Sequence, residues 1–168
     1  MFSSHKLYRE GIFLIINRRK FIISIAIPIL IGLLAGILTM GSMEAFKLLN
    51  KPPLSPPGWL FPVVWTILYI LMGIASYIIA SSPRKLRAKD ALKVYGLQLV
   101  FNFFWSIFFF NLEAYLFAFI WLVILWILIL ITTILFYGIS KPAGILMIPY
   151  LLWVTFAGYL NLAIYLLN

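Results

Sequence analysis

The chain has 168 residues, of which 65% are hydrophobic and 10% are charged, and its mean hydropathy is +1.11. This balance excludes a water-soluble domain, in which about one-quarter of the residues carry a charge. The absence of cysteine excludes disulfides, thiolate metal sites and a cysteine nucleophile, and the only histidine, His5, precedes the first apolar stretch.

Five uncharged stretches are long enough to cross a bilayer: 21–43, 54–83, 94–112, 114–140 and 142–168. A membrane helix needs about 20 apolar residues, whereas a barrel strand needs about 10 residues of alternating polarity, and these stretches do not alternate. We therefore predict an all-α integral membrane protein, a bundle of five helices over residues 21–168. The predicted spans are about 21–43, 59–81, 93–111, 114–138 and 143–166, with a proline-rich loop at 44–58.

Residues 1–20 form a basic N-terminal segment, which we expect to lie along the membrane interface or to be disordered; a signal peptide is the alternative for the first span. Eleven of the thirteen Lys and Arg residues fall on one side of the predicted bundle, and only Lys47 and Lys51 fall on the other. The positive-inside rule then predicts a cytoplasmic N-terminus. In this setting the net charge of +9 indicates topology and contact with anionic lipid, and not binding of nucleic acid.

Two features precede the second span. Gly32 and Gly36 have the small-residue spacing that allows close helix packing, either within the chain or in a dimer. The loop at 44–58 contains four prolines, which favour extended or polyproline backbone. It is either a rigid lid over the end of the bundle or a plain connector.

Polar and aromatic side chains recur on one face of the second, third and fifth spans. Asn102 in hydrocarbon requires a hydrogen bond, either to another helix or to a ligand. The fourth span is mostly aliphatic and aromatic and is predicted to be scaffold. The stripe residues are Trp65, Tyr69, Met72, Gly73 and Ser76; Gln98, Asn102, Trp105, Ser106 and Phe109; and Trp153, Phe156, Ala157, Leu160 and Asn161.

The spans contain no acid, base, thiol or histidine, so the sequence offers no conventional catalytic residues and no metal site, and it disfavours ion-coupled transport. What remains is a pocket walled by aromatics beneath the proline-rich loop, which suits a planar apolar ligand such as a tetrapyrrole or a sterol-like molecule. Haem would lack a His or Cys axial ligand inside the bundle and would be held by ring contacts. Simple core packing of the aromatic stripes is the alternative.

Three ordered blocks of sequence resemble the translocator protein family, also called tryptophan-rich sensory proteins or peripheral benzodiazepine receptors (TspO/MBR). The first runs from Lys51 to Tyr69 and continues into Met72-Gly73. The second comprises Gln98-Leu99, Asn102, Trp105-Ser106 and Phe108-Phe109, and the third runs from Pro149 to Val154 and continues with Phe156-Ala157 and Leu160-Asn161.

The resemblance implies a five-helix bundle, usually a homodimer, that binds porphyrin, haem or sterol-like ligands under the loop after the first span. It implies that Trp65 and Trp153 flank the ligand, that Asn102 and Ala157 line it, and that Phe46 contributes from the loop. Two departures from the family pattern weaken sterol binding and loop photochemistry: Leu54 stands where a tryptophan is common, and the last span ends without a basic residue after Lys141. With the stripe residues added, the expected ligand-binding set is Phe46, Trp65, Tyr69, Asn102, Trp105, Trp153, Ala157 and Leu160.

The leading hypothesis is a membrane receptor or carrier for porphyrin, haem or related ligands, with a sensory or regulatory role in tetrapyrrole metabolism and stress and with no required cofactor. One alternative is light-dependent porphyrin breakdown in which Trp65 or Trp153 takes part in electron transfer, which leaves open whether the protein is an enzyme. A second is a structural scaffold without a ligand. Basic loops on one side and a retained first helix are compatible with a bacterial plasma membrane.

Overall fold

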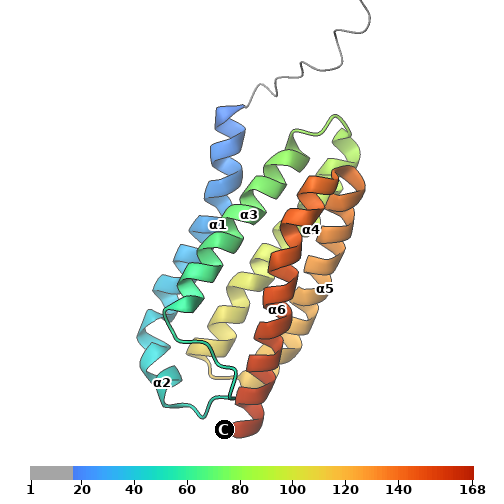
Figure 1. Ribbon diagram of the computed structural model, residues 1–168. Coiled ribbons are helices and arrows are strands. Elements are labelled where there is room, and N and C mark those ends of the chain that lie inside the picture. The colour runs from blue at the N-terminus through green and yellow to red at the C-terminus, as the bar shows by residue number, and fades with distance from the viewer. Residues whose placement is uncertain (1–16) are drawn as a thin grey trace, which may run out of the picture.

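Each of the five apolar stretches forms one long helix in the computed structural model, which describes residues 17–168 except for the side chains of residues 43–45 (Figure 1). The predicted all-α fold with five helices long and apolar enough to span a membrane is thereby confirmed. Residues 1–16 of the predicted N-terminal segment lie outside the described residues. The elements are α1 Arg18–Thr39, η1 Met40–Ser42, α2 Met43–Leu48, α3 Leu60–Ala80, α4 Lys85–Ser106, the π-helical turn η2 Ile107–Asn111, α5 Tyr115–Ile139 and α6 Lys141–Leu167.

Helix bounds differ from the sequence prediction in three places. α1 begins at Arg18, so the last three residues of the segment 1–20, predicted to be interfacial or disordered, are helical. α4 begins at Lys85, about two turns before the predicted start near residue 93, because its basic first turns are rich in good helix formers that extend the helix beyond the apolar segment. The start of the predicted loop is also helical, since α2 occupies Met43–Leu48 before the first proline, Pro52. The irregular loop is thus limited to residues 49–59.

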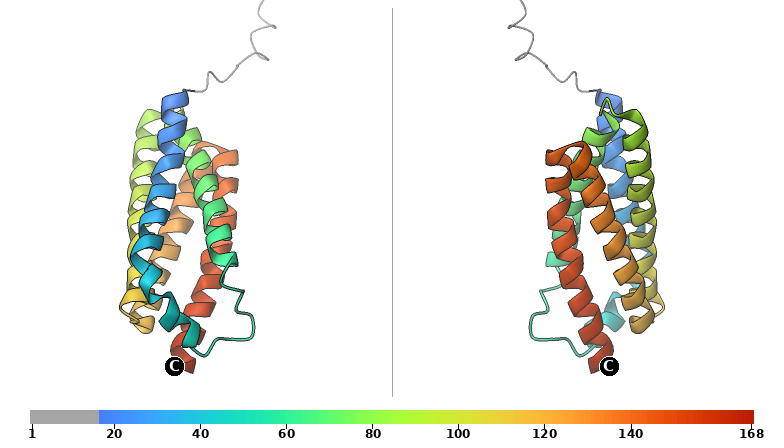
Figure 2. Two further views of the ribbon diagram at one scale, coloured as in Figure 1. Left: turned by 90° about the vertical axis from the view of Figure 1, so that its left-hand side faces the viewer. Right: turned by 90° about the vertical axis from the view of Figure 1, so that its right-hand side faces the viewer.

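The five long helices pack side by side in the order α1, α3, α6, α5 and α4, with α4 returning to contact α1 (Figure 2). The face of α1 that points away from the bundle carries many exposed aliphatic side chains, as expected for a helix that borders lipid. The shared core lies between α3, α4, α5 and α6, and its fully enclosed side chains include Met72, Leu99, Phe136 and Tyr150.

Glycines allow α1 and α3 to approach closely. A methyl group at Gly32 would overlap the ring of Tyr69 on α3, and one at Gly73 would lie 2.7 Å from the Cα of Ile25 on α1. A methyl group at Gly36 would meet no atom within 4 Å. Of the two glycines in the predicted small-residue seam, Gly32 therefore serves packing within the chain.

The basic residues gather at the two ends of the bundle as their sequence positions indicate. The N-terminus of α1, the first turns of α4 and the start of α6 lie at one end, and the loop at 49–59 with the C-terminus of α6 lies at the other (Figure 1). Arg84 joins the α3–α4 turn to the end of α5, because its guanidinium donates to the carbonyls of Gly138 at 3.1 Å and Ile139 at 3.3 Å. This contact satisfies carbonyls at the C-terminus of α5 that would otherwise have no helical partner.

Candidate functional site

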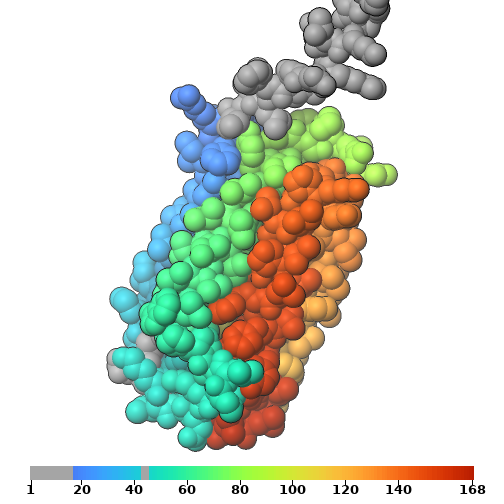
Figure 3. Space-filling model, in the orientation of Figure 1, coloured from blue at the N-terminus to red at the C-terminus, as the bar shows by residue number. Residues whose placement is uncertain are grey.

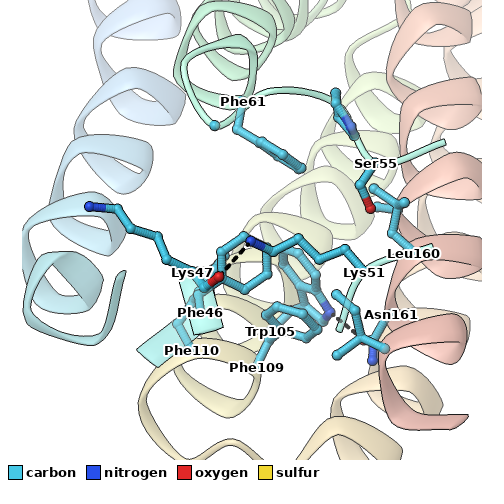
Figure 4. Close-up of a pocket in the computed structure, with 14 residues that line it drawn as sticks. Phe46, Lys47, Lys51, Ser55, Phe61, Trp105, Phe109, Phe110, Leu160 and Asn161 are labelled. Atoms are coloured by element: carbon cyan, nitrogen blue, oxygen red, sulfur yellow. Dashed lines mark hydrogen bonds between the residues drawn. The ribbon is translucent and has the colours of Figure 1, made fainter. Parts of the chain in front are cut away.

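A cavity of about 240 Å³ lies at the loop end of the bundle, enclosed by α2, the loop at 49–59, α3, α4 with η2, and α6 (Figure 4). We call it the loop cavity. It is predominantly apolar, and aromatic rings form much of its wall. Its lining residues are Phe46, Lys47, Lys51, Ser55, Pro56, Gly58, Phe61, Trp105, Phe109, Phe110, Ala157, Leu160, Asn161 and Ile164.

The aromatic wall is built around the end of α4. Trp105 stacks on Phe109 with ring centroids 5.4 Å apart, and Phe109 meets Phe110 edge-on at 4.9 Å. Both phenylalanines belong to the π-helical turn η2, a type of irregularity that is frequent at functional sites. Phe46 of α2 closes the wall, with centroid distances of 5.9 Å to Phe109 and 5.3 Å to Phe110.

Polar contacts fix the orientation of the Trp105 ring. Its indole Nε1 donates to the side-chain oxygen of Asn161 at 3.2 Å, and the amide of Asn161 donates in turn to the carbonyl of Tyr115 at 2.8 Å. α4, α6 and the start of α5 are therefore tied together at the cavity wall. Because Trp105 is held by α6, a ligand would meet a preformed aromatic surface.

The loop is held across the cavity by contacts with the end of α6. The backbone N–H of Asn50 donates to the side-chain oxygen of Asn168 at 3.0 Å, and the Asn168 amide donates to the Asn50 carbonyl at 3.1 Å. Figure 3 shows the loop lying against the last turns of α6. Lys51 bends back over the cavity, where its ammonium lies 4.7 Å from the Phe46 ring centroid and donates to the Lys47 carbonyl at 3.3 Å.

Four of the eight predicted ligand-binding residues line the loop cavity: Phe46, Trp105, Ala157 and Leu160. Sequence reasoning did not select Phe61, Phe110, Lys51 or Ile164. Helical periodicity offered a signal for two of them, since Phe61 lies four residues before Trp65 and Ile164 lies four residues after Leu160.

Tyr69 and Asn102, two of the other predicted residues, lie deeper, in a chain of buried hydrogen bonds that we call the mid-bundle network. The Tyr69 hydroxyl donates to Asn102 Oδ1 at 2.9 Å, and Asn102 Nδ2 donates to the Tyr150 hydroxyl at 3.0 Å. Tyr150 donates to Gln98 Oε1 at 3.0 Å. Of the two roles predicted for Asn102, the structure shows the tie between helices, here joining α3, α4 and α6.

Trp65 and Trp153 are separated from the loop cavity by one layer of side chains. Trp65 stacks on Tyr69 with centroids 5.4 Å apart, and its ring centroid is 6.5 Å from that of Trp105. Trp153 packs edge-on against Phe61 at 5.9 Å. Among the described residues its indole Nε1 is a buried donor without a hydrogen-bond partner.

Comparison with known proteins identifies the family. The TspO/MBR family model matches residues 24–167. A tryptophan-rich protein TspO from Chlorobaculum tepidum is 42% identical over 73% of this chain and 78% of its own, and one from Archaeoglobus fulgidus is 38% identical over 90% and 99%. The translocator protein of Bos taurus is 34% identical over 80% of this chain and 82% of its own. With five membrane-spanning helices and an aromatic cavity beneath the loop after the first of them, this chain belongs to the TspO/MBR family of integral membrane proteins.

Proposed function

We propose that the protein binds porphyrin, haem or a related planar apolar ligand in the loop cavity and acts as a membrane receptor or carrier with a sensory or regulatory role. The observation that carries the proposal is the wall formed by Trp105, Phe109, Phe110 and Phe46. Such rings offer faces and edges to a flat conjugated ligand. The names of two relatives, a tryptophan-rich sensory protein and a translocator protein, support a role in sensing or carriage.

The charges at the cavity support a ligand with anionic groups at its edge. Among the side chains that the structure describes, those of Lys47 and Lys51 are the charged ones that line it, and both are positive. A porphyrin that carries propionate groups could place its ring on the aromatic wall and its carboxylates toward these ammonium groups. The described part of the lining includes no His, Cys, Met or Tyr, so we expect haem to be bound there through its ring and its carboxylates without axial ligation.

Under this proposal the loop has to move when such a ligand binds. At about 240 Å³ the cavity is below the roughly 300–1,000 Å³ of typical ligand pockets. Phe61, Ser55 and Pro56 form its roof, and they belong to the loop and the first turn of α3. Displacement of this roof would enlarge the cavity toward Trp153 and its unpaired indole N–H.

The test is a titration of the detergent-solubilised protein with protoporphyrin IX in the dark, followed by tryptophan quenching and by the porphyrin spectrum. Ala157→Leu extends a side chain into the cavity and is expected to weaken binding at least tenfold, whereas Ala163→Leu, on the same helix but not in the cavity lining, serves as the matched control. Absence of saturable binding would refute the proposal and favour a scaffold or another ligand class. If Ala157→Leu and Ala163→Leu bound protoporphyrin IX with equal affinity, the binding site would lie outside the loop cavity.

One observation favours light-dependent porphyrin breakdown as a second candidate. Trp105 at the cavity, Trp65 behind it and Tyr69 beyond form a row of rings with centroid separations of 6.5 and 5.4 Å. Such a row could pass an electron to a photoexcited porphyrin, which would pass it on to dioxygen, the oxidant that oxidative opening of the ring consumes. Trp65→Phe is then expected to slow light-driven loss of the pigment while dark affinity stays unchanged, and a stable pigment under illumination would exclude this candidate.

We also propose a cytoplasmic N-terminus in a bacterial plasma membrane, and a homodimer. The support is the basic end of the bundle, which the positive-inside rule assigns to the cytoplasm, together with the dimeric state that the family resemblance implies. Because the chain has no cysteine, single introduced thiols report position without background. Ser55→Cys should react with an impermeant reagent in whole cells and Ser82→Cys should not, and Gly36→Cys on the exposed face of α1 should cross-link a dimer only if that face is the interface.

A further inference from the structure

A second hollow lies at the opposite end of the bundle from the loop cavity, along one face of α4. Its outer part has a volume of about 390 Å³ and is lined by Ala80, Leu92 and three lysines, Lys85, Lys89 and Lys93, among others. Its inner part, of about 290 Å³, shares Ala80 and Leu92 and continues between α1, α3 and α4 past Tyr95 and Gly96. The two parts join, and we call the whole the basic groove.

The lysines of the outer part are available to an anion. Within residues 17–168 neither the Lys85 nor the Lys89 ammonium forms a hydrogen bond or an ion pair, although Lys89 attracts Asp90 at longer range, whereas the Lys93 ammonium pairs with Asp90 at 2.9 Å. Their neighbour Arg84 differs, because its guanidinium is engaged with the end of α5. Three positive charges therefore face one acid at the rim of an apolar hollow.

The inner part of the groove contains an unsatisfied polar group. Tyr95 is 5% exposed, and among the described residues its hydroxyl makes no hydrogen bond of good geometry, although the Ser76 hydroxyl lies close enough to interact with it. Ser76 lies in the same hollow, but its hydroxyl donates to the Gly73 carbonyl at 2.9 Å. A buried hydroxyl that lacks a partner in hydrocarbon is costly, so this group favours an occupant that brings an acceptor.

The dimensions of the groove correspond to a lipid. The lining residues of α4 recur at spacings of three and four from Lys85 to Leu99, a face about 21 Å long at 1.5 Å per residue. This length covers the headgroup region and most of one leaflet of a hydrocarbon core about 30 Å thick. Gly96 faces the open space of the groove, since a methyl group there would meet no atom within 4 Å.

We propose that the basic groove binds one anionic phospholipid of the surrounding bilayer. Its phosphate is held by Lys85 and Lys89, one of its acyl chains lies along Leu92 and Gly96, and the Tyr95 hydroxyl donates to an ester oxygen below the phosphate. A free phosphate ion would leave the apolar inner part empty, so lipid is the occupant that uses both parts. The site is remote from the loop cavity, and the proposal therefore stands or falls independently of porphyrin binding.

The test is native mass spectrometry of the full chain, released from nanodiscs that contain phosphatidylglycerol and phosphatidylcholine. Wild-type protein should retain phosphatidylglycerol in preference to phosphatidylcholine. Each lysine near an anionic headgroup is expected to contribute about fivefold to that preference, so substitution of Lys85, Lys89 and Lys93 together by Gln should reduce it on the order of 100-fold. The triple substitution by Arg keeps the charges and should preserve the preference. Substitution of Arg18, Arg19 and Lys20 by Gln removes three charges outside the groove and is the matched control.

Two further variants examine the inner part without removing charge. Gly96→Leu should exclude the acyl chain and lower retention at least tenfold, while Gly138→Leu, another glycine with no neighbour within 4 Å of an added methyl group, should not. Tyr95→Phe should lower retention severalfold. Three outcomes would overturn the proposal in favour of unspecific electrostatic attraction of anionic lipid to the protein surface. They are equal retention of both lipids by the wild type, full retention in Gly96→Leu, and an equal loss in the Arg18, Arg19 and Lys20 control. Melting temperatures measured alongside exclude unfolding as the cause of any loss.

Discussion

Replacement of Asn168 by Leu should loosen the loop over the cavity. The Asn168 side chain accepts a hydrogen bond from the Asn50 N–H at 3.0 Å and donates one to the Asn50 carbonyl at 3.1 Å. A leucine of similar size can make neither. The side chain of Asn50 would keep only its longer contact, 3.4 Å, to the carbonyl of Leu167.

The magnitude follows from the two lost hydrogen bonds to the loop, since the third, from the Asn168 amide to the Ile164 carbonyl at 2.9 Å, lies within α6 and does not restrain the loop. Each contributes about 0.5–1.5 kcal/mol net, and because both are exposed to water we take a total of about 1.4 kcal/mol. That total corresponds to a tenfold rise in the population of the displaced loop. Hydrogen exchange of the loop amides at 50–59 should accelerate about tenfold, and bound protoporphyrin IX should dissociate faster by a similar factor if it leaves through the loop.

Two controls accompany this variant. Tyr165→Phe changes an exposed residue on the last turn of α6 and should leave both rates as in the wild type. Asn168→Asp retains the acceptor for the Asn50 N–H, and its exchange and dissociation rates should lie between those of Asn168→Leu and the wild type. Unchanged exchange at 50–59 in Asn168→Leu would refute the assignment of these contacts as the restraint on the loop; faster exchange with unchanged dissociation would refute the loop as the exit.

Three other substitutions have expected outcomes of their own. Gly73→Ala should lower stability by about 1–3 kcal/mol in thermal unfolding, because its methyl group would meet the α1 backbone, whereas Gly36→Ala should be neutral or slightly stabilising; equal effects would contradict the close approach of α1 and α3. Asn102→Leu should cost about 1–3 kcal/mol in the same melts, because the Tyr69 hydroxyl loses its acceptor and Tyr150 keeps only its hydrogen bond to Gln98. An unchanged melt would argue against the mid-bundle network as a tie between helices. Asn161→Leu removes the hydrogen-bond acceptor of the Trp105 indole and should weaken porphyrin binding by about 3- to 10-fold without affecting phosphatidylglycerol retention. Unaltered porphyrin affinity would show that the Trp105 ring does not need this hydrogen bond to hold its orientation.

The five-helix fold could be predicted from the sequence because length and hydrophobicity identify each membrane span, and both are local properties of the sequence. It was less informative about α4, since a charged segment such as Lys85–Lys93 contributes helix without contributing hydropathy. Within the candidate site, spacing identified the stripes of α3, α4 and α6 but not which member of a stripe faces the cavity. Asn102 and Trp105 are neighbours on one face of α4, yet one bonds to tyrosines and the other borders the cavity, a difference determined by the partner helices.

The mid-bundle network also bears on the route that a cargo could take. On α3 and α4 its members Tyr69 and Asn102 lie between the loop cavity and the basic groove: Tyr69 follows Phe61 and precedes Ser76 on α3, and Asn102 lies between Leu99 and Trp105 on α4. A planar ligand that passed along the bundle axis would have to separate three helices and break the hydrogen bonds of four polar side chains within the hydrocarbon region. The loop cavity is thus closed toward the middle of the bundle. A ligand bound there would enter and leave from the same face of the membrane, or sideways into the adjoining leaflet.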